Sequence, residues 1–526
     1  MATVRDAVFG VLRQLGLTRI FANPGSTEVA LLTDLPDDLS FVLALHENSV
    51  IGMAAGHALA SGRPSLALLH TTAGFGNAVG AIATARTNRA PLVILVGQQD
   101  RRHLDAEPFL AGHLRGLAGE YPVSVRTPEC AQALPGAVAR AYHDAVARKG
   151  PAVVIVPMGD WAEPAGEQAR PAAPVVLRHS AAADPAVTTE VAGLLAGATA
   201  PAIVVGPGAD DARSWAALID LAGRLDAPVW QEAYASQAGF PHDHPRFRGH
   251  LPALRDRLRA TLAPHDLVLV AGGPAFRQGG FREGPFVEDG TTVVVLTDDH
   301  DIAGYSAADL AVVGDIPATL EDLAPRVRAR EPRTAAPAER AVPAVEPGGP
   351  LRAAHVFAEL AARLPAESTV FEESPSTRGQ LLDLVPARAP FGFLTVAQGG
   401  LGFALPGATG VKLARPERPV VALVGDGASL YGIQALWSAA HYRAGVLFVI
   451  LDNGGYAVMD RLAHEAGGKP PWPGFAEIDP VALATGFGCP ARRVDTYGEL
   501  VDAFDELVPT LAGRTTPLLL DVHVEP

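Results

Sequence analysis

Residues 420–427 read VVALVGDG and residues 446–455 read VLFVILDNGG. Each stretch begins as a continuous run of apolar and β-branched residues, which is typical of a strand buried on both faces of a parallel sheet. Each run ends in a polar, glycine-rich segment. Because the carboxyl ends of neighbouring parallel strands meet at one edge of the sheet, where ligands bind, we expect Gly-Asp-Gly and Asn-Gly-Gly to lie side by side.

These two segments predict a metal and phosphate site. Asp426 offers a carboxylate and Asn453 an amide oxygen, and two such oxygens, a backbone carbonyl and diphosphate oxygens form a ligand shell for Mg²⁺. Gly425 and Gly427 let the backbone approach the phosphates, and the helix start that follows adds N–H donors. The alternative is a plain strand, turn and helix in which Asp426 is only a turn residue.

Apolar runs of the same kind recur along the chain and alternate with helical patterns such as Asp211–Leu225 and Leu351–Leu364. This alternation predicts an α/β protein with doubly wound parallel sheets, repeated several times. The predicted strands are Ser65–Leu69, Leu92–Val96, Ala152–Val156, Ala202–Val205, Leu267–Ala271, Thr292–Leu296, Val420–Val424, Val446–Leu451 and Leu518–Val522.

Two stretches rich in Ala, Pro and Glu, Glu163–Pro174 and Ala329–Pro350, lack an apolar period and are predicted to be exposed linkers. They divide the chain into three blocks, each of the size of one doubly wound domain. We therefore expect domains over residues 1–165, 180–330 and 350–526.

The composition argues against several classes of protein. A net charge of −15 in 526 residues disfavours a nucleic-acid or anionic-membrane partner. No apolar stretch reaches the roughly 18 residues of a membrane span, and Met1–Gly16 lacks the apolar core of a signal peptide. The only cysteines, Cys130 and Cys489, cannot build a disulfide framework or a cysteine-rich zinc site, which favours a reducing, cytoplasmic compartment.

The motifs together resemble those of thiamine-diphosphate-dependent enzymes, and the resemblance spans essentially the whole chain. The Gly-Asp-Gly and Asn-Gly-Gly pair is similar to the family's diphosphate fingerprint. The first block resembles the family's pyrimidine-binding domain, and the middle block resembles its central domain. Among subfamilies the chain is most similar to the benzoylformate decarboxylases, on the segments Asn23-Pro24-Gly25-Ser26, His70-Thr71-Thr72-Ala73-Gly74 and Gly399-Gly400-Leu401-Gly402-Phe403-Ala404-Leu405-Pro406.

The resemblance implies thiamine diphosphate and Mg²⁺ as cofactors and assigns roles to individual residues. It implies that Glu47 contacts the pyrimidine ring nitrogen, that His70 is an acid or base and that Ser26 contacts the substrate carboxylate. The implied metal ligands are Asp426, Asn453 and the Gly455 carbonyl. The implied cofactor contacts are Glu47, Ser376, Gly399, Leu401, Gly425, Asp426, Gly427, Ala428, Tyr456 and Met459.

The substrate side departs from the family pattern. Benzoylformate decarboxylases carry a second histidine on the loop after a Phe-Arg pair, and the matching position here is about Gly279. Other relatives use adjacent histidines, whereas His103 and His113 are separated. Val458 and Leu462 stand where the most similar subfamily has a small residue and an aromatic one. Asp460 lies between them and adds an acidic side chain that could donate a proton. We therefore expect that protonation of the reacting carbon after CO₂ leaves is slow, and that a histidine placed at Gly279 would speed it up.

The leading functional hypothesis is decarboxylation of a small 2-oxo acid, similar to benzoylformate, to an aldehyde and CO₂. The main alternatives are a carboligase of the acetolactate-synthase or acyloin type and a divergent paralogue with weak decarboxylase activity. A non-catalytic cofactor-binding paralogue and a dinucleotide enzyme are weaker alternatives. Because family members pair the glutamate and the Gly-Asp-Gly site across two chains, the resemblance implies a homodimer or homotetramer with active sites at the dimer interface.

Overall fold

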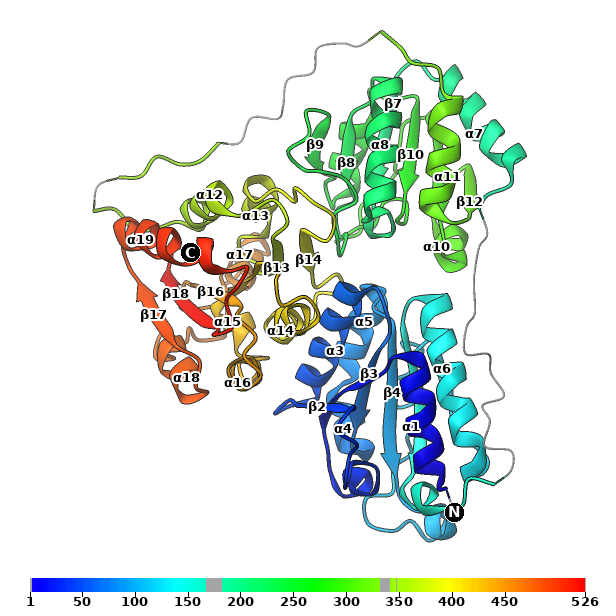
Figure 1. Cartoon of the computed structure of the whole chain (residues 1–526). Coiled ribbons are helices and arrows are strands. Elements are labelled where there is room, and N and C mark those ends of the chain that lie inside the picture. The colour runs from blue at the N-terminus through cyan, green and yellow to red at the C-terminus, as the bar shows by residue number, and fades with distance from the viewer. Residues whose placement is uncertain (1, 167–181, 332–340, 347, 526) are drawn as a thin grey trace.

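The structure is a computed structural model that describes residues 2–166, 182–331, 341–346 and 348–525. It contains three six-stranded sheets in which every pairing of neighbouring strands is parallel. Helices cover both faces of the sheets (Figure 1). The predicted α/β class with three doubly wound sheets is confirmed.

The first sheet has the strand order β2-β1-β3-β4-β6-β5. Helices α1 and α6 cover one face, and α3 with α5 covers the other. The elements are α1 (Val4–Leu15), β1 (Arg19–Asn23), α2 (Val29–Leu32), β2 (Ser40–Leu43), α3 (Glu47–Ser61), β3 (Ser65–Leu69), α4 (Thr71–Asn77), α5 (Val79–Thr87), β4 (Leu92–Gln98), β5 (Ser124–Arg126), α6 (Leu134–Arg148) and β6 (Pro151–Pro157).

The second sheet has the order β12-β11-β10-β7-β8-β9. Helices α7, α8 and α11 pack on one face and α9 on the other. The elements are α7 (Pro185–Gly197), β7 (Pro201–Val205), α8 (Ala212–Leu225), β8 (Val229–Gln231), β9 (Phe247–His250), α9 (Arg255–Leu262), β10 (Leu267–Ala271), β11 (Thr292–Thr297), α10 (His300–Tyr305), β12 (Leu310–Val313) and α11 (Ile316–Leu323).

The third sheet has the order β14-β13-β15-β16-β18-β17. Helices α12 and α19 pack on one face, and α14 and α16 on the other. The elements are α12 (Ala353–Arg363), β13 (Thr369–Glu373), α13 (Arg378–Leu384), β14 (Phe393–Thr395), α14 (Ala404–Ala414), β15 (Val420–Gly425), α15 (Asp426–Ser429), α16 (Ala435–His441), β16 (Leu447–Asp452), α17 (Ala457–Glu465), α18 (Pro480–Gly486), β17 (Ala491–Val494), α19 (Tyr497–Leu507) and β18 (Leu518–His523).

All nine strands that the apolar runs predict are present, with ends that differ by at most two residues. The predicted helix over Asp211–Leu225 begins one residue later, because the Asp211 side chain accepts the Arg213 and Ser214 N–H groups and caps α8. Of the two predicted linkers, residues 167–174 of the first and 332–340 and 347 of the second lie outside the described residues. The described residues 329–331, 341–346 and 348–350 form neither helix nor strand, and the domain bounds stay a prediction.

The first and third sheets share one continuous apolar core. Helix α3 lies on the first sheet, α14 lies on the third, and the two helices pack against each other (Figure 1). Because α3 begins at Glu47 and α14 follows the Gly399–Gly402 segment, this packing connects the helices that border two groups of predicted site residues.

Candidate active site

A pocket of about 220 Å³ lies at the carboxyl edge of the third sheet. This pocket is lined by all the residues between positions 350 and 526 that were predicted to contact the cofactor or the metal. Five residues not predicted to contact the cofactor or metal also line it: Ser374, Pro375, Thr377, Leu451 and Val458. The predicted residues in the lining are Ser376, Gly399, Leu401, Gly425, Asp426, Gly427, Ala428, Asn453, Gly455, Tyr456 and Met459.

The two side chains that are predicted to bind the metal, those of Asp426 and Asn453, approach the same backbone N–H group. Strands β15 and β16 are parallel neighbours, so Asp426 and Asn453 leave the sheet at the same edge. The Gly455 N–H lies 3.1 Å from Asp426 Oδ2 and 3.2 Å from Asn453 Oδ1. Burial, aided by the nearby Asp452 carboxylate, raises the pKa of Asp426 to about 6. Two converging hard oxygens with a backbone carbonyl suit Mg²⁺, so the residues present fit the predicted ion.

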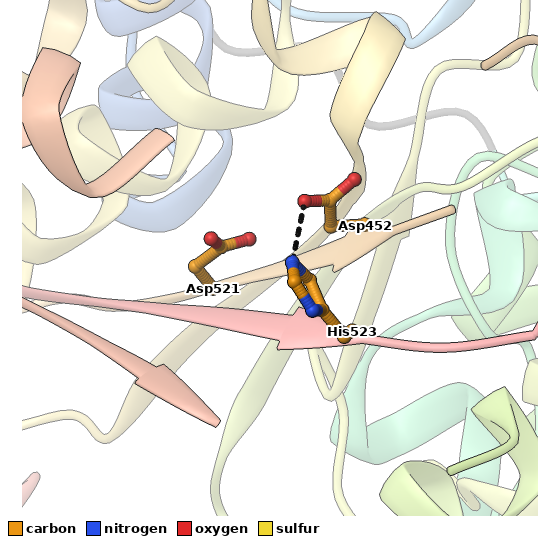
Figure 2. Close-up of side chains that lie close together, drawn as sticks. All are labelled: Asp452, Asp521 and His523. Atoms are coloured by element: carbon orange, nitrogen blue, oxygen red, sulfur yellow. Dashed lines mark ion pairs between the residues drawn. The ribbon is translucent and has the colours of Figure 1, made fainter. Parts of the chain in front are cut away.

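A cluster of two carboxylates and a histidine lies beside the loop that carries Asn453. Figure 2 shows Asp452, Asp521 and His523 at the ends of β16 and β18. His523 Nε2 lies 3.2 Å from Asp452, and its Nδ1 lies 2.8 Å from Asp495. The other Asp452 oxygen accepts the Gly454 N–H at 3.0 Å. His523 therefore restrains Asp452, which in turn restrains the loop that carries Asn453.

Two further contacts shape the pocket walls. Ser376 Oγ accepts the Val458 N–H at 3.0 Å, which connects the β13–α13 loop to the start of α17. A side chain at Gly427 would project to within 2.5 Å of the Tyr456 ring. The Tyr456 ring packs edge-on against Phe475. Glycine at position 427 thus allows the backbone to lie against this aromatic wall, as a close phosphate-binding turn requires.

Glu373 at the end of β13 fixes the glycine-rich segment beside the pocket. It is almost fully buried, and its carboxylate accepts the N–H groups of Gly402, Phe403 and Ala404 at 2.5, 2.9 and 2.6 Å. Burial raises the pKa of Glu373 to about 7, and these N–H donors oppose that shift. The sequence analysis missed this residue, which caps the start of α14.

The predicted residues of the first domain gather at the carboxyl edge of its own sheet. Glu47 is 8% exposed and begins α3 after β2. Its Oε1 accepts the Asn23 amide at 3.0 Å, and its Oε2 accepts the Asn77 amide at 3.1 Å. Glu47 is therefore a buried carboxylate held by two amides at the start of a helix.

His70 lies at the end of β3, and its ring is oriented by a buried acid. Its Nδ1 lies 2.9 Å from Glu28 Oε2 and 3.0 Å from Thr27 Oγ1, and Glu28 is 1% exposed. Because Nδ1 is occupied, Nε2 is the ring nitrogen left for other partners. Ser26 is exposed at the start of a 3₁₀ turn capped by Gly25. Glu28, Asn23 and Asn77 were missed as site residues, although they lie within the quoted motifs or directly beside them.

The pocket of about 220 Å³ contains no residue from before position 374. Glu47, His70 and Ser26 thus form a second group that does not line it in the single chain. On the substrate side, the proposed proton donor Asp460 accepts the Trp472 indole N–H at 2.8 Å, and Leu462 is half exposed.

Comparisons with known proteins agree with this fold. Three family models match: the N-terminal binding domain of thiamine pyrophosphate enzymes over residues 2–117, their central domain over 188–323 and their C-terminal binding domain over 377–522. The chain belongs to the thiamine pyrophosphate enzymes. The predicted membership, and with it an enzyme related to the benzoylformate decarboxylases, is confirmed.

Individual relatives extend over the full length. The chain is 38% identical to benzoylformate decarboxylase of Pseudomonas aeruginosa, covering 100% of this chain and 99% of that one. It is 25% identical to acetolactate synthase of Arthrospira platensis, with 98% and 93% covered. Among solved structures, a thiamine diphosphate-dependent 4-hydroxybenzoylformate decarboxylase of Rhodococcus jostii RHA1 matches with a TM-score of 0.94 and 35% identity, covering 100% and 99%.

No helix within the described residues is both long enough and apolar enough to span a membrane.

Proposed function

We propose that this protein is a Mg²⁺- and thiamine-diphosphate-dependent decarboxylase that converts a 2-oxo acid similar to benzoylformate to an aldehyde and CO₂. One observation carries the proposal. Residues of the Gly-Asp-Gly and Asn-Gly-Gly segments line one pocket together with Ser376, Gly399 and Leu401. The buried acid Glu47 and the histidine His70 lie at the carboxyl edge of the first sheet. The cofactor, when bound, supplies the electron sink for breaking the bond to CO₂.

The third domain would hold the cofactor and its metal ion. Asp426, Asn453 and the Gly455 carbonyl would bind Mg²⁺, as their convergence on one backbone group supports. Ser376 and the N–H groups after Gly425 would bind phosphate oxygens. Leu401 and Met459 would pack against the cofactor rings, and the Gly399 carbonyl would accept a hydrogen bond from the pyrimidine amine.

The first domain would supply acid–base groups. Each Glu47 oxygen accepts one amide N–H and keeps a lone pair with which the carboxyl group can share a proton with the pyrimidine nitrogen. His70 contacts Glu28 through Nδ1, and its Nε2 would exchange a proton with the substrate carbonyl oxygen. The exposed hydroxyl of Ser26 would bind the substrate carboxylate.

A complete site would need a second copy of the chain. Glu47 does not line the pocket that contains Asp426, and large apolar side chains such as Phe109 (87% exposed) and Leu462 are uncovered. We propose a homodimer or homotetramer with active sites at the dimer interface. Free Cys130 and Cys489 support a cytoplasmic location, and the net charge of −15 supports the absence of a nucleic-acid or membrane partner.

Carboligation is the second candidate. The side chains lining the cavity next to the cofactor pocket include no histidine. Without this proton donor the reactive intermediate would live longer and could react with an aldehyde. The test is a panel of 2-oxo acids with thiamine diphosphate and Mg²⁺. We expect CO₂ and free aldehyde from aryl 2-oxo acids. CO₂ with a hydroxyketone in place of free aldehyde would favour the carboligase, and no CO₂ from any member would reject both.

A further inference from the structure

A second cavity adjoins the cofactor pocket. It has a volume of about 370 Å³ and shares Pro375, Gly399 and Leu401 with that pocket. A substrate bound next to the reactive part of the cofactor would therefore extend into this cavity. Any side chain that donates a proton to this substrate should therefore be among the residues that line the cavity.

The two acids that line this cavity, Glu372 and Glu373, already accept hydrogen bonds from other groups of the protein. Glu372 accepts hydrogen bonds from the Thr395 hydroxyl at 2.5 Å and from Arg378 at 3.3 Å. Glu373 accepts three backbone N–H groups. Thr395, whose hydroxyl donates to Glu372, and the arginines and glutamines of the lining do not act as proton donors at neutral pH, which leaves one polar lining residue.

The exception is Tyr234, in the turn after β8. Its hydroxyl makes no hydrogen bond with any described residue, and its ring is half-buried in the cavity wall. The guanidinium groups of Arg277 and Arg378 lie 5.8 and 6.0 Å from the ring centre. These two cations hold the ring in place and favour negative charge in its surroundings.

Gly279 on the facing loop makes room for this hydroxyl. A Cβ atom at position 279 would lie 2.2 Å from Tyr234 Oη, closer than real Cβ contacts. The loop is fixed in this position by the hydrogen bond from the Gly279 N–H to the Ala253 carbonyl at 3.0 Å. The tyrosine hydroxyl thus occupies the space into which a side chain at position 279 would project.

From this geometry we infer that Tyr234 is a catalytic residue that protonates the substrate carbon after decarboxylation, which rests on the proposed function. The bond between the oxo carbon and the carboxylate breaks, CO₂ leaves, and the electron pair stays on the carbon. That carbon takes the proton of the Tyr234 O–H, which forms the aldehyde C–H bond. Solvent water then returns a proton to the phenolate.

The first test needs no cofactor. In the apo protein, Gly279→Ala should lower the melting temperature, because the new methyl group displaces the Tyr234 hydroxyl. In a Tyr234→Phe background the same substitution should cost less than half as much, because the hydroxyl is gone. An equal cost in both backgrounds would place the hydroxyl elsewhere and overturn the inference.

The second test follows both products from benzoylformate in the loaded enzyme. Tyr234→Phe should release CO₂ at the wild-type rate in the first turnover and aldehyde about 10²-fold more slowly, with more hydroxyketone when aldehyde is added. Tyr305→Phe, on the same domain, is the matched control and should behave as wild type. Adding Gly279→His to Tyr234→Phe should restore aldehyde release. Gly279→His alone should not raise it, contrary to the expectation from the sequence, because the Tyr234 hydroxyl occupies the space for the new side chain.

The outcomes separate the two proposals. Equal, fast release of CO₂ and aldehyde by Tyr234→Phe would overturn the role of Tyr234 alone. The absence of CO₂ from wild-type enzyme with every 2-oxo acid tested would overturn the proposed function and the proton-transfer step together.

Discussion

The backbone of Gly407 in α14 lies where a side chain of Gly56 in α3 would project. A Cβ atom at position 56 would be 2.0 Å from the Gly407 carbonyl oxygen, and one at Gly410 would be 2.0 Å from the Met53 carbonyl oxygen. Two helices can approach this closely only through glycine. The contact sets the position of α3, which starts at Glu47, against α14, which starts beside the Gly399–Gly402 segment.

We expect Gly56→Ala to destabilise the protein by about 1–3 kcal/mol, the usual cost of an extra methyl group in a packed core. Gly10→Ala is the matched control, because it also lies in a helix but has open space at its Cβ position. It should be neutral or stabilising, since alanine favours a helix. Thermal unfolding of both variants checks this, and equal stability of the two would contradict the close packing.

Glu47→Gln should keep the side-chain shape but remove the group that shares a proton. We expect a rate loss on the order of 10²–10⁴, slow exchange of the cofactor's thiazolium proton in deuterated buffer, and nearly unchanged cofactor binding. Glu190→Gln, an exposed change on α7, should leave all three unchanged. Near-normal turnover of Glu47→Gln would reject the assignment.

Asp426→Asn should weaken Mg²⁺-dependent cofactor binding by more than the about 10–100-fold that loss of a supporting residue costs. Because the pKa of Asp426 is raised to about 6, protons compete with Mg²⁺ for its carboxylate. Wild-type Mg²⁺ affinity should therefore fall as the pH drops below about 6. Calorimetric titration at several pH values measures both effects, with Asp502→Asn on the exposed side of α19 as the control. Asp426→Asn binding equal to that of the control would exclude Asp426 as a ligand.

Glu232 gives a pH-dependent stability prediction. It is 1% exposed, and burial raises its pKa to about 7, a shift that the Arg277 charge and the Tyr234 backbone N–H oppose. Because the folded-state pKa lies above the ordinary value of 4.5, the wild-type protein is fully stabilised below that value and loses stability as the pH rises through about 7.

Glu232→Gln removes this titration. Its unfolding free energy relative to wild type should increase from pH 4.5 to pH 8, by on the order of 1–3 kcal/mol. Chemical denaturation across that range measures the difference. The exposed Glu283→Gln should show no such trend, and a pH-independent difference for Glu232→Gln would contradict the prediction.

The assembly can be tested by mixing two inactive variants. In a dimer that pairs Glu47 of one chain with Asp426 of the other, a mixed dimer of Glu47→Gln and Asp426→Asn contains one intact site. Refolding the two together should restore about a quarter of wild-type activity if the chains mix at random. Recovery of none, or a fully active monomer in sedimentation, would place both residues of each site in one chain.

Much of the fold followed from the sequence because the central strands are continuous apolar runs, and this pattern is specific to strands buried on both faces. Strand β13 was missed although it lies inside its sheet, between β14 and β15, because its sequence TVFEE ends in two carboxylates. Those acids are buried only because they bind groups distant in the sequence, such as Thr395 and Gly402. Short strands at or near the sheet edges, such as β5 and β14, carry too few residues to show a period.

The cofactor side of the site was predictable because its contacts lie in local motifs at strand ends. Glu28 was missed as a partner of His70 because the two residues are separated by 42 positions. Tyr234 could not be predicted either. Its place opposite Gly279 depends on how two loops of the central domain approach each other, which no local pattern in the sequence encodes.

The most direct test of the central claim measures CO₂ and aldehyde together from benzoylformate, with and without thiamine diphosphate and Mg²⁺. We expect equal amounts of both products over many turnovers, full dependence on the cofactor and the ion, and loss of both products in Asp426→Asn. Cofactor-independent turnover, or no CO₂ from benzoylformate or any other 2-oxo acid in the loaded enzyme, would contradict it.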